Sequence, residues 1–112
     1  MEKSLFVKIK EAVTQWIKNN ECKFKSINIM IEIVENSEER LYAILNFGKC
    51  MASIVVAEPD FAPYRFVSFE VVAMENGIAT MPYSWYDESG NAIEHVIKNL
   101  EKSVNIVFEY NS

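Results

Sequence analysis

The chain has 112 residues, of which 50% are hydrophobic and 24% charged, and its 16 acidic and 11 basic residues give a formal net charge of −5. This composition is typical of one globular domain and excludes disordered and fibrous classes. The basic residues are scattered and form no stripe that would follow phosphates, so we expect no direct binding to nucleic acid. No window approaches the roughly 20 apolar residues of a membrane helix, which argues against a membrane protein.

The two cysteines, Cys22 and Cys50, lie in different segments and have no metal-ligand spacing around them. We therefore expect free thiols, with no disulfide, no metal site and no other cofactor. Charged residues interrupt the apolar residues of the first segment every few positions, which is unlike the apolar core of a signal peptide. These two features predict a soluble, cytoplasmic protein.

Apolar residues recur every three or four positions over residues 4–20, which predicts an amphipathic helix that ends at Asn19 or Asn20. From Ile27 the apolar period changes to two, the period of a strand. Polar turns then separate further strand-like stretches, at residues 41–47, 53–56 and 67–73. Residues 58–65 contain two prolines and predict a stiff, irregular loop.

The dipeptide Asn76-Gly77 favours a type I′ hairpin turn, after which residues 78–86 should return as a fifth strand. Pro82 lies inside this strand and has no N–H to donate, so the strand should lie near an edge or contain a bulge.

A second helix should follow, with Asp87 and Ser89 as its caps and Lys102 near its end. Alternation over residues 104–110 then predicts a sixth strand. The whole pattern predicts a single α+β domain over residues 1–112. Its antiparallel, meander-like sheet has five to six strands, and an N-terminal and a C-terminal helix pack on it.

Catalytic motifs are missing from the sequence, among them a glycine-rich phosphate loop, the GxSxG elbow and HExxH. The single histidine, His95, should lie on the exposed side of the second helix. A paired-carboxylate hydrolase would need two acidic side chains close together, but solubility is the simpler explanation of acidic residues on strands. The carboxylates considered for such a pair are Glu32, Asp60, Glu70, Glu75 and Asp87. We therefore predict that the protein is not an enzyme.

Aromatic and acidic residues gather in the proline-containing loop and in the stretch before the second helix. Aromatic side chains are enriched at binding hot spots, although the same residues also close the ends of protein cores. An acidic, aromatic surface would suit a basic protein partner. The candidate interaction surface comprises Asp60, Phe61, Tyr64, Trp85, Tyr86, Asp87 and Glu88.

Residues 84–100, SWYDESGNAIEHVIKNL, run from an aromatic strand end through Tyr86, Asp87 and Gly90 into an amphipathic helix. This segment, about a sixth of the chain, resembles parts of small bacterial immunity proteins that neutralise polymorphic toxins. The resemblance implies an acidic, non-catalytic protein that blocks a toxin through an acidic or aromatic surface. It assigns no individual functional residue.

Three functions follow from these patterns. The first is a non-enzymatic protein-interaction module, most concretely an immunity-type inhibitor of a basic toxin. The second is a small-molecule-binding protein or small enzyme, with a pocket between sheet and helices lined by Trp16, Tyr83 and Trp85. The third is a homo-oligomeric domain that associates through the strand containing Pro82 or through another edge of the sheet.

Overall fold

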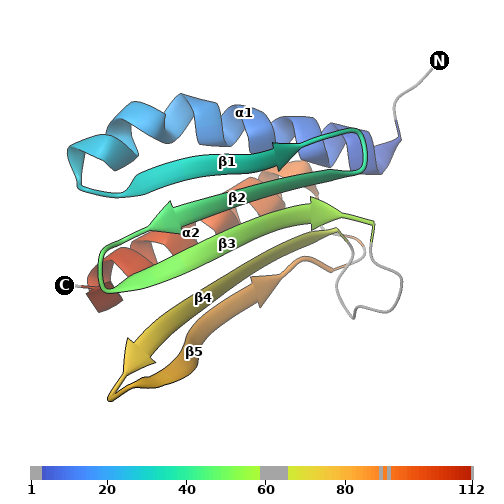
Figure 1. The fold of residues 1–112 in the computed structure, drawn as a ribbon. Helices are drawn as coiled ribbons and strands as arrows, with labels where there is room; N and C mark the ends of the chain where they lie inside the picture. Colours follow the sequence, from blue (N-terminus) through green and yellow to red (C-terminus); the bar gives the residue numbers. More distant parts are fainter. Residues whose placement is uncertain (1–3, 59–65, 89, 91, 112) are drawn as a thin grey trace.

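The computed structural model describes residues 4–58, 66–88, 90 and 92–111. In chain order its elements are α1 (Leu5–Ser26), β1 (Met30–Asn36), β2 (Arg40–Asn46), β3 (Cys50–Ala57), β4 (Val67–Glu75), β5 (Ile78–Tyr86) and α2 (Ile93–Asn111). The strands form one five-stranded sheet in the order β1-β2-β3-β4-β5, and every neighbouring pair is antiparallel (Figure 1). The expected α+β meander with a helix at each end is confirmed.

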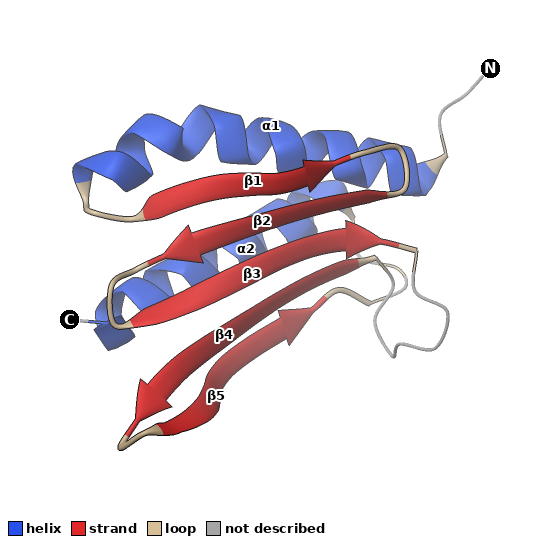
Figure 2. Cartoon of the chain, viewed as in Figure 1, coloured by secondary structure: helices blue, strands red, loops and turns tan. Residues whose placement is uncertain are grey.

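The domain has two layers, a layer of two helices and a single sheet (Figure 2). Alternate residues of the three central strands are fully buried, and they join the apolar stripes of α1 and α2 in one core cluster. Because side chains alternate across a strand, the intervening residues point to the opposite face, which neither of the two described helices covers. Neither described helix is long and apolar enough to cross a membrane.

Helix α1 begins where the periodicity predicted but is longer than predicted. The Ser4 hydroxyl accepts a hydrogen bond of 3.2 Å from the backbone N–H of Val7. The predicted end at Asn19 or Asn20 is wrong, because Asn20 stays helical and donates its side-chain N–H to the Trp16 carbonyl. The helix ends at Ser26 with Ile27 as its C-cap, and Asn28 then takes a left-handed φ of 64°.

The sixth strand predicted over residues 104–110 is also wrong. Helix α2 continues through this segment to Asn111, and its buried residues Leu100, Val104 and Val107 recur at helical spacing. The alternating Ile106, Phe108 and Tyr110 on which the prediction rested are exposed side chains of the same helix. The helix continues because burial of a helical stripe outweighs a short alternating pattern.

Both edge strands of the sheet carry an irregularity. In β1 the pairing with β2 shifts between Ile33 and Glu35, and in β5 the pairing with β4 shifts opposite Val72, beside Pro82. The predicted edge position of the Pro82 strand is confirmed, as is the hairpin turn, where Asn76 and Gly77 have φ values of 53° and 78°. Bulges and prolines at edges hinder pairing with further strands.

Candidate interaction surface

The structure does not bring the described members of the predicted surface to one side of the molecule. Trp85 and Tyr86 are consecutive in β5 and therefore point to opposite faces of the sheet: Trp85 packs against the core, whereas Tyr86 lies on the uncovered face. Glu88 is exposed just beyond the strand. Asp60, Phe61 and Tyr64 lie outside the described residues.

Asp87 is buried, with none of its side chain exposed, and so cannot contact a partner in the way the sequence suggested. One of its carboxylate oxygens accepts hydrogen bonds of 2.8 Å from the backbone N–H groups of Phe66 and Val67. The Asp87 backbone N–H also bonds to the Val67 carbonyl. Asp87 therefore joins the end of β5 to the start of β4 and does not cap α2, which begins six residues later at Ile93.

The aromatic residues predicted to line a ligand pocket lie in separate environments. Trp16 is 6% exposed, meets the ring of Phe24 edge to face, and borders a cavity of about 110 Å³ between the two helices. Tyr83 instead packs on Phe69, and its hydroxyl lies 2.9 Å from that of buried Ser103.

The uncovered side of the sheet, which we call the open face, is the most unusual surface of the described chain. Solvent-facing positions of an antiparallel sheet are ordinarily polar, but many here are aliphatic, aromatic or methionine. Three rows of cross-strand neighbours follow from the register. They are Met30-Asn46-Met51-Val72, then Glu32-Ile44-Ser53-Glu70-Ser84, and then Glu35-Tyr42-Val55-Ser68-Tyr86.

The first of these rows makes an apolar end of the open face. Met30 is 64% exposed, Met51 45% and Val72 47%, and Met74, two residues beyond Val72 on β4, is 64% exposed. Isolated exposed apolar residues are common, whereas these residues are neighbours and form a contiguous apolar patch on one face.

Two carboxylates lie in the middle row, at Glu32 and Glu70. The Tyr86 hydroxyl donates a hydrogen bond of 2.7 Å to Glu70, which holds that carboxylate in place on the sheet. Three inter-strand steps of about 4.8 Å each separate Glu32 from Glu70, too far for a catalytic pair. The considered pairings of Glu70 with Asp87 or Glu75 also fail, since Asp87 is buried and Glu75 bonds to the Tyr110 hydroxyl at the other end of β4.

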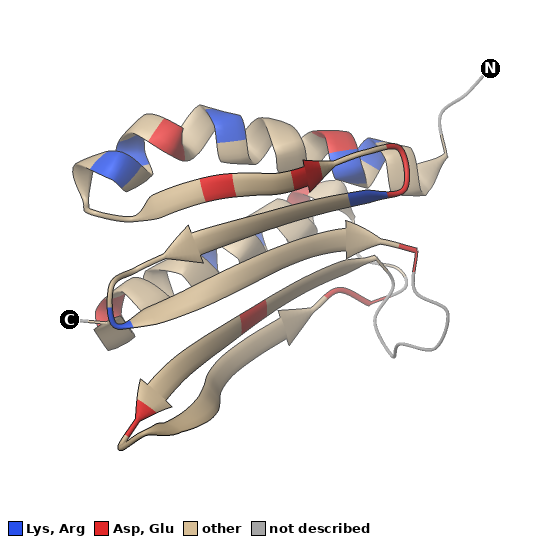
Figure 3. Ribbon diagram, viewed as in Figure 1, with Lys and Arg blue, Asp and Glu red and all other residues tan. Residues whose placement is uncertain are grey.

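Charge is divided between the two layers (Figure 3). The described helices carry seven lysines against five glutamates, whereas the described residues from β1 to Glu88 carry nine acidic side chains against two basic ones. Within the five strands the single cation is Arg40, which forms an ion pair of 2.5 Å with Glu35 and lies over the ring of Tyr42. The hydrogen bond from Arg40, aided by one from Ser37, lowers the pKa of Glu35 and keeps it ionised.

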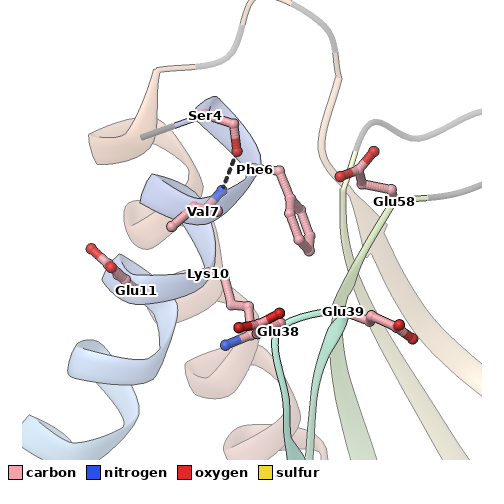
Figure 4. A pocket seen from close by; sticks show the side chains of 8 residues that line it. All are labelled: Ser4, Phe6, Val7, Lys10, Glu11, Glu38, Glu39 and Glu58. Carbon is pink, nitrogen blue, oxygen red and sulfur yellow. Dashed lines mark hydrogen bonds between the residues drawn. The ribbon is translucent and has the colours of Figure 1, made fainter. Parts of the chain in front are cut away.

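A second hollow lies at the start of α1, beside the turn that joins β1 to β2. It measures about 700 Å³, and Figure 4 shows the ring of Phe6 projecting from α1 toward the strands, with Glu39 and Glu58 on the strand side. Lys10, at its edge, donates to the Asn36 side chain over 2.8 Å. No group of three or more histidine, cysteine or acidic side chains within the described residues is arranged to hold a metal ion.

His95 is exposed on α2, as its position outside the apolar stripe predicted. The sequence patterns did not predict the open face, although one signal was available: Met, Val, Ile and Tyr occupy strand positions that alternate with the core residues.

Comparisons of the chain with known protein families, curated proteins and solved structures found no match.

Proposed function

We propose that this protein is a non-enzymatic interaction domain that binds a basic protein through its open face. The observation that carries the proposal is the composition of that face, where a row of exposed apolar side chains lies beside the row that contains Glu32 and Glu70. Arg40 is the single cationic residue in the five strands, and it is already paired with Glu35. Apolar contacts would supply affinity, and the carboxylates would select a positively charged surface.

Charge also favours a different protein over a second copy as the partner. Two open faces brought together would set carboxylates against carboxylates in a desolvated interface, which is costly. Pairing through the sheet edges is hindered as well: β1 carries Glu32, Glu35 and a bulge, while β5 carries Pro82 and a bulge. A basic protein bound to the open face would set cations against these carboxylates and would not need to pair with a sheet edge.

The resemblance of residues 84–100 to immunity proteins makes a basic toxin the first partner to test. The domain would neutralise such a toxin by covering the toxin's positively charged functional site with the open face. Inhibition then needs no chemistry from the domain, only a tight and specific complex.

The test combines partner capture with titration. The tagged protein is purified from its host's lysate at modest salt, the bound protein is identified by mass spectrometry, and its affinity is measured by calorimetry against wild type and the variant Glu32→Lys/Glu70→Gln. We expect a basic partner whose affinity falls at least about tenfold, with a weaker salt dependence. The control is Glu94→Lys/Glu109→Gln, with similar charge changes at exposed sites on α2.

Thermal unfolding of each variant first establishes that it is folded. Equal affinity of the open-face variant and the wild type would contradict the proposal, as would a partner with an acidic contact surface. A small molecule retained without any protein would instead direct attention to the hollow at Phe6 and the alternative of a ligand-binding protein.

A further inference from the structure

The apolar end of the open face contains a recess. It has a volume of about 280 Å³ and lies where β2 turns into β3, with Met51, Val72 and Met74 on the sheet side and Gly48 and Lys49 on the turn side. At roughly 30 Å³ for each water molecule of the liquid, this volume is large enough for one leucine or phenylalanine side chain.

The walls of the recess suit an apolar group. Met51 and Val72 are direct cross-strand neighbours, and Met74 follows on the same side of β4. Methionine side chains are flexible and polarisable, so they adapt to the shape of whatever they contact. Side chains that fill such recesses commonly dominate the affinity of an interface.

Glu70 lies at a fixed distance from this recess. It is two residues before Val72 in a regular stretch of β4, so both side chains point to the open face about 7 Å apart. The hydrogen bond from the Tyr86 hydroxyl restrains the carboxylate. Lys49 borders the recess on the side away from Glu70. Because Lys49 repels a positive charge and Glu70 attracts one, a cation of the partner should lie on the Glu70 side of the recess, toward the centre of the sheet.

We propose that the partner inserts one apolar side chain into the recess of Met51, Val72 and Met74 while a lysine or arginine about 7 Å away pairs with Glu70. The inference rests on the proposed function, and it names the contact pair that gives the interaction its specificity. In an extended segment this spacing belongs to residues i and i+2, whose side chains share one face. The partner therefore presents, in extended conformation, a basic and an apolar residue with one residue between them, in either order, which we call the basic-X-apolar spacing.

The probe is a displayed library of random short peptides selected on the wild-type protein. Enriched peptides are synthesised and titrated by fluorescence anisotropy against wild type, the recess variant Met51→Gln/Val72→Thr, and Glu70→Gln. These substitutions keep side-chain size, and Thr keeps the β-branched shape that suits a strand. Leu5→Gln, at a residue of α1 that is 47% exposed, and Glu94→Gln on α2 are the matched controls.

We expect enrichment of peptides with a basic residue two positions from an apolar one. Their affinity should fall at least about tenfold in both open-face variants and change less than about twofold in the controls. In addition, Tyr86→Phe should weaken the binding of basic peptides but not that of analogues whose basic residue is replaced by glutamine, because Tyr86 acts through Glu70.

The outcomes separate this inference from the proposed function. If Glu70→Gln weakens binding and the recess variant does not, the paired contact is wrong while a basic partner for the open face stands. If neither variant changes affinity, both proposals fail. Enriched peptides that lack the basic-X-apolar spacing would likewise overturn the inference.

Discussion

The side chain of Asp87 holds the backbone of Val67, a residue twenty positions earlier, through a hydrogen bond of 2.8 Å. The same carboxylate oxygen also accepts from the N–H of Phe66. We expect Asp87→Ala to lower the free energy of unfolding by about 2–4 kcal/mol, because it leaves buried N–H groups without their charged acceptor.

Urea denaturation followed by circular dichroism measures this change. Asp87→Asn keeps an acceptor oxygen and should lose less stability than Asp87→Ala. The exposed Glu94→Gln is the control and should leave the denaturation midpoint unchanged. A loss for Asp87→Ala as small as that for the control would contradict the role assigned to this carboxylate.

The hydroxyls of Tyr83 and Ser103 should be energetically coupled. They lie 2.9 Å apart and tie β5 to α2, with Ser103 fully buried. Tyr83→Phe or Ser103→Ala alone should each cost about 1 kcal/mol of stability, since each leaves the other hydroxyl without its partner. The double variant should cost less than the sum, and a double-mutant cycle in urea measures that difference. Simple additivity would show that the hydroxyls do not interact.

Pro82 should protect the β5 edge from pairing with a second molecule. Pro82→Val restores a backbone N–H in the edge strand β5. This strand has no charged residues, and its Ile78 and Met81 are 67% and 55% exposed. Light scattering after size-exclusion chromatography should therefore give a higher apparent mass for this variant than for wild type at high concentration. Ala79→Val adds apolar surface to the same strand but keeps the proline, and should not raise the mass. An unchanged mass for Pro82→Val would remove this protective role.

The two thiols should differ strongly in reactivity. Cys22 is exposed, whereas Cys50 is 3% exposed and its burial raises the pKa of the thiol above the ordinary 9.0. A raised pKa lowers the thiolate fraction at any pH below it, and burial also blocks the reagent. In the Cys22→Ser variant the remaining thiol is Cys50. This thiol should react slowly with a disulfide reagent at about pH 8 while the variant is folded, and fast once it is unfolded in denaturant. In the folded Cys50→Ser variant the remaining thiol, Cys22, should react fast. Equal reaction rates of the two folded variants would contradict the assigned environments.

The sequence by itself determined the elements of this domain and their order. The change of apolar period from 3.6 to 2 near Ile27, the Asn76-Gly77 turn and Pro82 at an edge are local signals, because each depends on the preferences of a few neighbouring residues. The errors lie where local patterns were ambiguous. Asn20 can either end a helix or bond within it, and residues 104–110 fit either period.

Only the tertiary structure decided which of these residues can meet a partner. Trp85 and Tyr86 are adjacent in the sequence yet belong to opposite faces, and the acidic Asp87 beside them is buried by the backbone that it binds. Conversely, Glu70 and Met51 come from separate strands and meet on one face only because the sheet is paired in one register. With both helices on the other side, that face stays open, since burial is settled by long-range packing and the residues alone do not reveal which layer will be covered.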